Sequence, residues 1–190
     1  MVTTVTRRSV GPADGCELPS TVTIWTAGFG VPDLARRCGL TTDAAGRLLT
    51  DETLTSVDDA RIVAAGDAAA PSDLPYRMSC QAATQLGPQA AETVLARLEG
   101  RAPAPVRVGF VAQCLSLGRR DGVFQSAHRD DTAARFHLAG RTGAVVKELI
   151  CRSTVWSLRQ EARKPCAHRW WLADGTRRQA LETRGDPARR

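Results

Sequence analysis

The chain has 190 residues, of which 43% are hydrophobic and 24% charged, a composition typical of a folded globular protein and unlike that of a disordered one. No apolar run approaches the ~20 residues of a transmembrane helix, and residues 1–8 contain no signal-peptide core, so we expect a cytoplasmic protein. The six cysteines form no CxxC pair and the three histidines have no metal-ligand spacing, which predicts neither a dithiol motif nor a metal site.

The net charge of +6 lies in the carboxy-terminal part of the chain. Residues 151–190 contain ten Lys or Arg and four Asp or Glu, whereas residues 1–150 contain sixteen of each. Aromatic residues make up only 5% of the chain and no basic stripe alternates with stacking rings, which disfavours nucleic acid as a partner. The basic segment from Cys151 onward, which carries Trp156, Trp170 and Trp171, predicts weak contact with anionic membrane surfaces, a peripheral location on the inner face of the membrane. A solvated, disordered tail is the alternative.

The first predicted elements are short. Val22–Trp25 is β-branched and aromatic and predicts a strand that ends in a glycine turn at Gly28. Residues 33–38 predict a short helix closed by Gly39. Further short strands are expected over residues 47–50 and around residue 53.

A buried strand and a turn follow. Residues 61–65 are a short apolar run, typical of a fully buried strand of a parallel sheet, and Gly66-Asp67 comes directly after it. Residues 68–70 predict a helical turn before Pro71.

A longer helix is predicted over residues 79–99, with Ser79 as its N-cap and Gly100 just past its end. Four apolar residues at helical spacing are expected to face a core: Leu86, Ala90, Val94 and Leu98. Pro88 predicts a kink or break near Gly87.

The carboxy-terminal third begins after a Pro-rich linker at 101–105. Residues 110–117 and 123–126 flank a glycine-bounded turn and predict a β-hairpin. A last helix is expected over 142–163, presenting Val145, Val146, Leu149, Ile150 and Trp156, and no periodicity is evident beyond Pro165.

The segment from Thr50 to Ala69 carries the most specific pattern. A Thr-rich strand and turn precede an apolar strand that ends in Gly-Asp. A carboxylate delivered to the mouth of a sheet can accept hydrogen bonds from a sugar-like hydroxyl chain, while a helix start beside it offers N–H groups to an anion. An isolated Gly-Asp turn is the structural alternative.

This segment resembles the second flavin motif of type II NADH dehydrogenases, in the FAD-dependent pyridine nucleotide-disulphide oxidoreductase superfamily. The resemblance implies that Asp67 holds the ribityl chain of FAD, with Gly66 and Ala68 near the pyrophosphate. Thr26-Ala27-Gly28 is similar to the family's motif where the chain re-enters the FAD domain, which makes Gly28 another cofactor-binding candidate.

Residues 80–85, Cys-Gln-Ala-Ala-Thr-Gln, are similar to the family's AQxAxQ segment. The resemblance implies that Gln81 and Ala82 lie beneath the flavin ring and that Gln81 and Gln85 border a quinone pocket. Glutamines at i and i+4 share one helix face and can bind a carbonyl headgroup, although a polar surface face is the alternative.

The family's GxGxxG fingerprint, expected once for FAD and once for NAD, does not occur. Gly28-Phe29-Gly30 lacks the third glycine, and Pro32 follows where a helix should start. We therefore expect the carboxy-terminal part of the enzyme, with a missing amino-terminal half or a second copy in a homodimer as its partner.

The sequence thus predicts an α/β fold, the carboxy-terminal segments of a Rossmann-like FAD-binding domain with a small hairpin and helix appendage. The expected divisions are 1–30, the end of an NAD(P)-binding domain; 31–100, half of the FAD domain; 106–164, the hairpin and helix; and 165–190, the basic tail. The predicted function is an FAD-dependent NAD(P)H oxidoreductase that reduces an acceptor such as a quinone, with no catalytic side chain in this chain. A non-enzymatic interaction module or partner subunit is the alternative.

Overall fold

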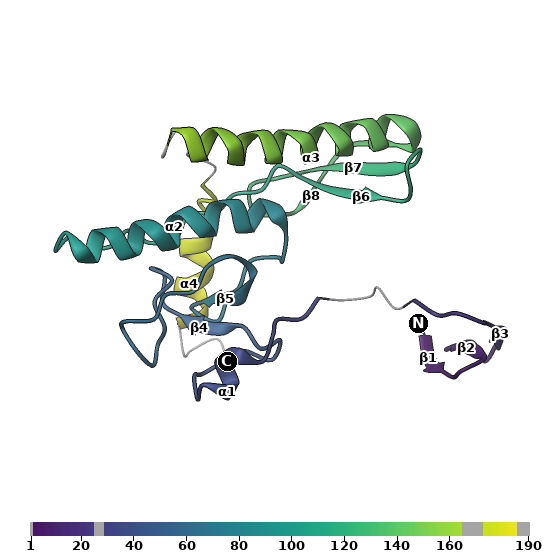
Figure 1. The fold of residues 1–190 in the computed structure, drawn as a ribbon, viewed down its shortest axis with the longest axis horizontal. Coiled ribbons are helices and arrows are strands. Elements are labelled where there is room, and N and C mark those ends of the chain that lie inside the picture. The colour runs from purple at the N-terminus through teal and green to yellow at the C-terminus, as the bar shows by residue number, and fades with distance from the viewer. Residues whose placement is uncertain (1, 25–28, 165–172, 186–190) are drawn as a thin grey trace. The chain divides into compact units, whose positions relative to one another are not determined.

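The computed structural model describes residues 2–24, 29–164 and 173–185, and the chain divides into two compact units, Met1–Gly30 and Val31–Arg190. The described residues combine small β-sheets with four α-helices (Figure 1). This mixed composition confirms the predicted α/β class in its coarse form.

The first unit is a three-stranded antiparallel sheet of β1 (Val2–Val5), β2 (Ser9–Pro12) and β3 (Leu18–Pro19). The strand predicted to start at Val22 is wrong, because residues 22–24 are exposed and have no regular structure. A β-branched run forms a strand only where a neighbouring strand pairs with it, and no such neighbour occurs among the described residues.

The second unit opens with α1 (Leu34–Arg37), a single turn that ends as predicted. Gly39 follows with φ of 76°, the left-handed conformation that closes a helix. Beyond it, β4 (Leu48–Thr50) and β5 (Ala69–Pro71) form a parallel pair, and β5 is buried along its whole length.

The predicted parallel strand over residues 61–65 is wrong. That segment forms one isolated bridge, between Val63 and Thr55, and both of its ends are exposed. Gly66–Ala68 is a 3-10 turn and β5 follows it, so the helical turn expected over 68–70 is also wrong. An apolar run does not specify its own pairing partner, and here the alanines after the turn, not the residues before it, pair with β4.

α2 (Cys80–Leu98) begins and ends as predicted. The Ser79 hydroxyl accepts a hydrogen bond from the Ala82 N–H at 3.2 Å, and Gly100 follows the helix with φ of 70°. The helix continues through Pro88 without the predicted break. Gly87 has no Cβ to clash with the Pro88 ring, which removes the main steric cost of a helical residue before proline.

The predicted apolar stripe of α2 is only half correct. Leu86 and Ala90 are buried, but Val94 is 43% exposed and Leu98 is 79% exposed. Residues spaced strictly by four drift about 40° per step on a helix of 3.6 residues per turn, so the end of the stripe leaves the core. Thr93 and Ala96 are buried there instead.

The segment that follows the predicted linker returns to the core. Residues 101–111 have no regular structure, yet Val106, Val108 and Phe110 are buried against α2 and the parallel pair. Arg107, between Val106 and Val108, is exposed. Buried and exposed side chains thus alternate there, as in an extended chain with one buried face.

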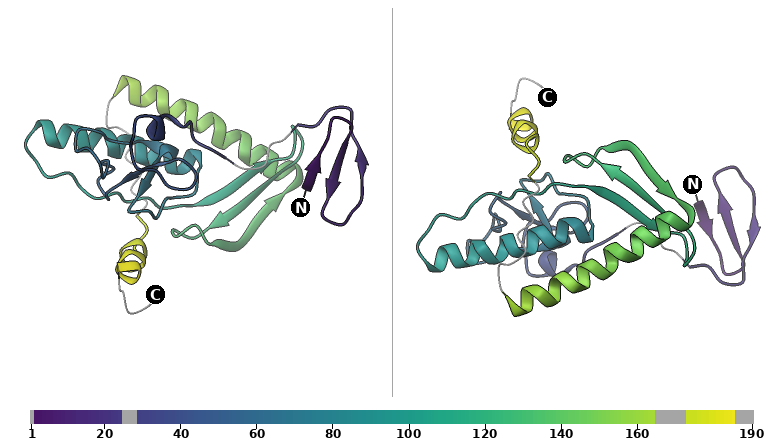
Figure 2. Two further views of the ribbon diagram at one scale, coloured as in Figure 1. Left: turned by 90° about the horizontal axis from the view of Figure 1, so that it is seen from below. Right: turned by 90° about the horizontal axis from the view of Figure 1, so that it is seen from above.

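The predicted hairpin is confirmed as β6 (Ala112–Ser116) and β7 (Gly122–Ala127), and β8 (Ala133–Ala139) adds a third antiparallel strand that the sequence did not predict. α3 (Gly140–Arg163), close to the predicted 142–163, lies along this sheet (Figure 2).

α3 approaches the sheet through a glycine. A Cβ on Gly143 would lie 2.2 Å from the Gly122 carbonyl oxygen, so only glycine permits this contact. Gly143 is the buried residue of the helix, and Val145, Leu149 and Trp156 are each more than half exposed.

The last described element, α4 (Arg177–Gly185), lies in the segment predicted to be an irregular basic tail. Arg177 is buried with 8% of its surface exposed. Residues 165–172 and 186–190 of that tail lie outside the described residues.

Candidate functional site

The Gly-Asp turn lies against the amino-terminal end of α2. Asp67 is half-buried, and its Oδ1 accepts a hydrogen bond from the Ser79 backbone N–H at 3.1 Å. Gly66 has φ of 61°, and a Cβ placed there would lie 3.6 Å from the Ala83 Cβ. The turn therefore brings a carboxylate to the start of a 19-residue helix.

Further polar groups surround this carboxylate. Within the described residues, Asp67 Oδ2 makes no hydrogen bond, and neither do the backbone N–H groups of Cys80 and Gln81. Ala68 is exposed beside them. A ligand at this place meets both an acceptor and helix-end donors.

Arg77 is a neighbour that the sequence analysis missed. Its guanidinium lies within electrostatic reach of Asp67. It donates to both oxygens of Asp131 at 2.5 and 2.8 Å, which raises the pKa of Arg77, and it lies 5.0 Å from the centre of the Phe110 ring. The two partners of this ion pair are 54 residues apart, so no local pattern could have found it.

Ala82 contributes to the core instead of the surface. Its side chain is 1% exposed, and its N–H is bonded to the Ser79 hydroxyl. The methyl group expected beneath a flavin therefore packs inward.

The two glutamines bind the returning backbone segment. Gln85 is buried; its Nε2 donates to the Gly109 carbonyl at 3.0 Å, and its Oε1 accepts from the Gly109 N–H at 3.2 Å. Gln81 Oε1 accepts from the Val111 N–H at 2.8 Å. Gln81 Nε2 makes no hydrogen bond within the described residues. Both glutamines thus pin the extended segment to α2.

Gly28, the remaining predicted cofactor-binding residue, lies outside the described residues. No group of three or more His, Cys, Asp or Glu side chains that could hold a metal ion occurs in the described part of the chain. The described cysteines are free, and burial raises the pKa of the Cys114 thiol.

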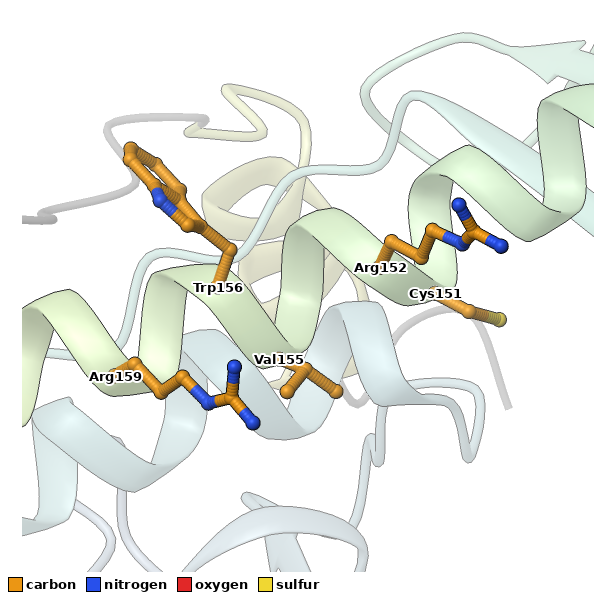
Figure 3. Close-up of a pocket in the computed structure, with 5 residues that line it drawn as sticks. All are labelled: Cys151, Arg152, Val155, Trp156 and Arg159. Carbon is orange, nitrogen blue, oxygen red and sulfur yellow. The ribbon is translucent and has the colours of Figure 1, made fainter.

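A separate shallow groove lies on α3 (Figure 3). All five residues that line it come from this helix: Cys151, Arg152, Val155, Trp156 and Arg159. Among the described residues, none of the helices has the length and apolarity needed to cross a membrane.

The comparisons with known proteins bear on the fold. No protein-family model and no curated protein sequence matches the chain. Among solved structures, the chain is similar to the sulfide:quinone oxidoreductase of the hyperthermophilic bacterium Aquifex aeolicus, with a TM-score of 0.57 and 14% sequence identity. The match covers 96% of this chain and 44% of that one, so the chain has a fold similar to less than half of a sulfide:quinone oxidoreductase.

Proposed function

We propose that this chain forms the ribityl side of an FAD site in a NAD(P)H oxidoreductase, with Asp67 as the residue that binds the ribityl chain. The observation that carries this proposal is the position of Asp67 at the start of α2. One carboxylate oxygen is bonded to the Ser79 N–H, and the other is available to a ligand.

The groups around Asp67 have the chemistry that a flavin needs. A carboxylate accepts hydrogen bonds from ribityl hydroxyls, and the N–H groups of Cys80 and Gln81 lie at the positive end of a helix, where an anionic or carbonyl oxygen is stabilised. Ala68, which the resemblance places near the pyrophosphate, is exposed. The fold similarity to a sulfide:quinone oxidoreductase supports the same family of sites.

A bound flavin would supply the redox chemistry, taking hydride from NAD(P)H and passing electrons to an acceptor such as a quinone. The chain itself would bind and orient. For a quinone headgroup, Gln81 is the stronger candidate of the two glutamines, because its Nε2 is available whereas both amide atoms of Gln85 are bonded to Gly109.

The adenine side of the site requires other residues, since the chain contains no GxGxxG motif. We expect a different partner chain to supply it, and the chain alone to purify without colour. Weak binding of flavin fragments is then the property to measure.

The test is a titration of the isotope-labelled chain with FMN, FAD and adenosine, followed by amide NMR. FMN and FAD should shift the same amides, at residues 66–68 and 79–83, and adenosine, which has neither a flavin ring nor a phosphate, should leave them in place. An equal response to adenosine, or shifts confined to other regions, would reject the ribityl role.

The second candidate is a non-enzymatic module that binds a separate flavoprotein chain or a second copy. The exposed apolar side chains of α3 favour it, because such residues usually become covered by a partner. Sedimentation analysis that detects self-association, together with no FMN response in the NMR titration, would select this alternative.

A further inference from the structure

The Arg177 guanidinium belongs to the charged residue with the least exposed surface among the described residues. It donates to the two carboxylate oxygens of Glu52 at 2.9 and 2.8 Å, to the Leu74 carbonyl at 2.9 Å and to the Pro71 carbonyl at 3.0 Å. Its carbon Cζ lies 4.3 Å from the centre of the Tyr76 ring. Planar, multidentate contacts of this kind fit a guanidinium and do not fit an ammonium group.

The acceptor pocket is built without help from α4. Glu52 Oε1 also accepts a hydrogen bond from the Ser72 hydroxyl at 2.7 Å, and the Leu74 N–H closes the turn onto the Pro71 carbonyl at 2.9 Å. The Tyr76 ring lies 6.4 Å from the Phe110 ring, within the core. These contacts hold the carboxylate, the carbonyls and the ring in place independently of Arg177.

α4 itself is attached lightly. Arg177 is its buried residue, and the remaining described residues of the helix are exposed or partly exposed. Besides Arg177, Arg184 contacts the backbone carbonyl and carboxylate of Asp73 at the surface. The Asp174 N–H, just before the helix, donates to the Val108 carbonyl at 3.3 Å. A helix of nine residues is not stable alone, so its position depends on these few contacts, of which those of Arg177 are the buried ones.

We propose that Glu52, the carbonyls of Pro71 and Leu74, and the Tyr76 ring form a guanidinium-binding site that the chain's own α4 occupies reversibly, so that an arginine-bearing peptide can take its place. Residues 173–185, which include α4, then act as a detachable strap. Because the buried ion pair loses hydration on both sides, its net contribution to stability is small and release is accessible. This inference does not depend on the proposed flavin site.

Release of the strap would change the contacts that hold the connection between β5 and α2. Arg177 holds this connection at Pro71 and Leu74, and Asp67 holds its other end at Ser79. Release of α4 would remove the hydrogen bonds of Arg177 to this connection and leave those of Ser72 and Asp67.

The test uses the full chain with Arg177→Ala and a fluorescent peptide of residues 173–185. The emptied site should bind the peptide, whereas the wild-type chain should bind it roughly 100-fold more weakly, because a tethered strap competes at an effective concentration on the order of millimolar. Arg178→Ala is the matched control, since the Arg178 side chain is 89% exposed on the same helix and, among the described residues, forms an ion pair only with Glu182. This variant should behave as the wild type.

A second variant guards against misfolding. Arg177→Lys keeps a positive charge beside Glu52 and should also accept the peptide if Arg177→Ala does not fold by circular dichroism. A peptide carrying R177K should bind neither variant. Binding no tighter than that of the Arg178→Ala chain, or equal binding of the R177K peptide, would overturn the proposal.

Discussion

The Asp67 carboxylate and the Ser79 backbone N–H, 3.1 Å apart, tie the Gly-Asp turn to the first turn of α2. Ser79 is also the N-cap of that helix, through its hydroxyl and the Ala82 N–H. The candidate ligand-binding carboxylate is therefore also a structural support of the helix, and the two roles need separate tests.

Two substitutions separate these roles. Asp67→Ala should lower the free energy of unfolding by about 1 kcal/mol, because it removes the acceptor of the Ser79 N–H. Asp67→Asn keeps an acceptor oxygen and should change the stability by less than about 0.5 kcal/mol. Urea unfolding measures both, and equal destabilisation by the two changes would show that the charge, not the hydrogen bond, stabilises the helix start.

The contact between Gly143 and Gly122 predicts that Gly143→Ala destabilises the chain, the opposite of the effect expected from helix propensity. Alanine ordinarily stabilises a helix interior by roughly 0.5–1 kcal/mol relative to glycine. At Gly143 the added Cβ would lie 2.2 Å from a carbonyl oxygen, so Gly143→Ala should destabilise the chain by at least about 2 kcal/mol in urea unfolding. Ser153→Ala, exposed on the same helix, is the control. A Gly143→Ala chain as stable as the wild type would disprove the close approach.

Tyr76 is the one tyrosine of the sequence, so its ionisation can be followed by tyrosinate absorbance without interference. Burial raises the pKa of Tyr76 to about 12, and its hydroxyl has no hydrogen-bond partner within the described residues, although the Val108 backbone lies near it.

The pH dependence of stability follows from this raised pKa. The unfolded chain releases the tyrosine proton near its ordinary pKa of about 10, whereas the folded chain keeps it. The stabilisation is complete below about pH 10 and is lost as the pH rises through about 12, by roughly 2–3 kcal/mol in total. A pH titration of urea unfolding measures this loss, and an absorbance midpoint near the ordinary tyrosine pKa would contradict the burial.

The exposed face of α3 predicts membrane-surface binding. Trp156 is 56% exposed beside Arg152 and Arg159, and indole rings and basic residues favour an anionic interface. Vesicles with anionic lipid should co-sediment the chain, neutral vesicles should not, and binding should fall as salt is raised. Trp156→Ala should weaken binding severalfold, while Phe136→Ala, an equally exposed aromatic residue on β8, should not. Identical losses in both variants would remove α3 from the contact.

Elements with local signals could be predicted from the sequence. The ends of α2 were found because Ser79 caps through its own side chain and Gly100 takes a positive φ, and Gly39 ends α1 for the same reason. The hairpin turn between β6 and β7 was likewise marked by its glycines. Each of these signals acts within a few residues along the chain.

Features that depend on distant partners could not be predicted. In the parallel pair of β4 and β5, each residue pairs with one that lies 21 positions later in the sequence. The apolar run at 61–65 does not indicate this pairing. Arg177 contacts Glu52 across 125 residues of sequence, and one buried arginine among the three in a polar helix gives no periodic signal. At the candidate site, Asp67 was found from its motif, but Arg77 and the Gly109 contacts of Gln85 required the structure.

The central claim is that Asp67 binds a flavin, and the affinity of the purified chain for FMN tests it most directly. Flavin fluorescence titrations should give an affinity about tenfold weaker for Asp67→Asn than for the wild type, because a charge-assisted hydrogen bond to the ribityl chain is replaced by a neutral one. Asp121→Asn, an exposed acid in the turn between β6 and β7, should leave the affinity unchanged. Equal FMN affinity of Asp67→Asn and wild type, or no saturable FMN binding by either, would contradict the account.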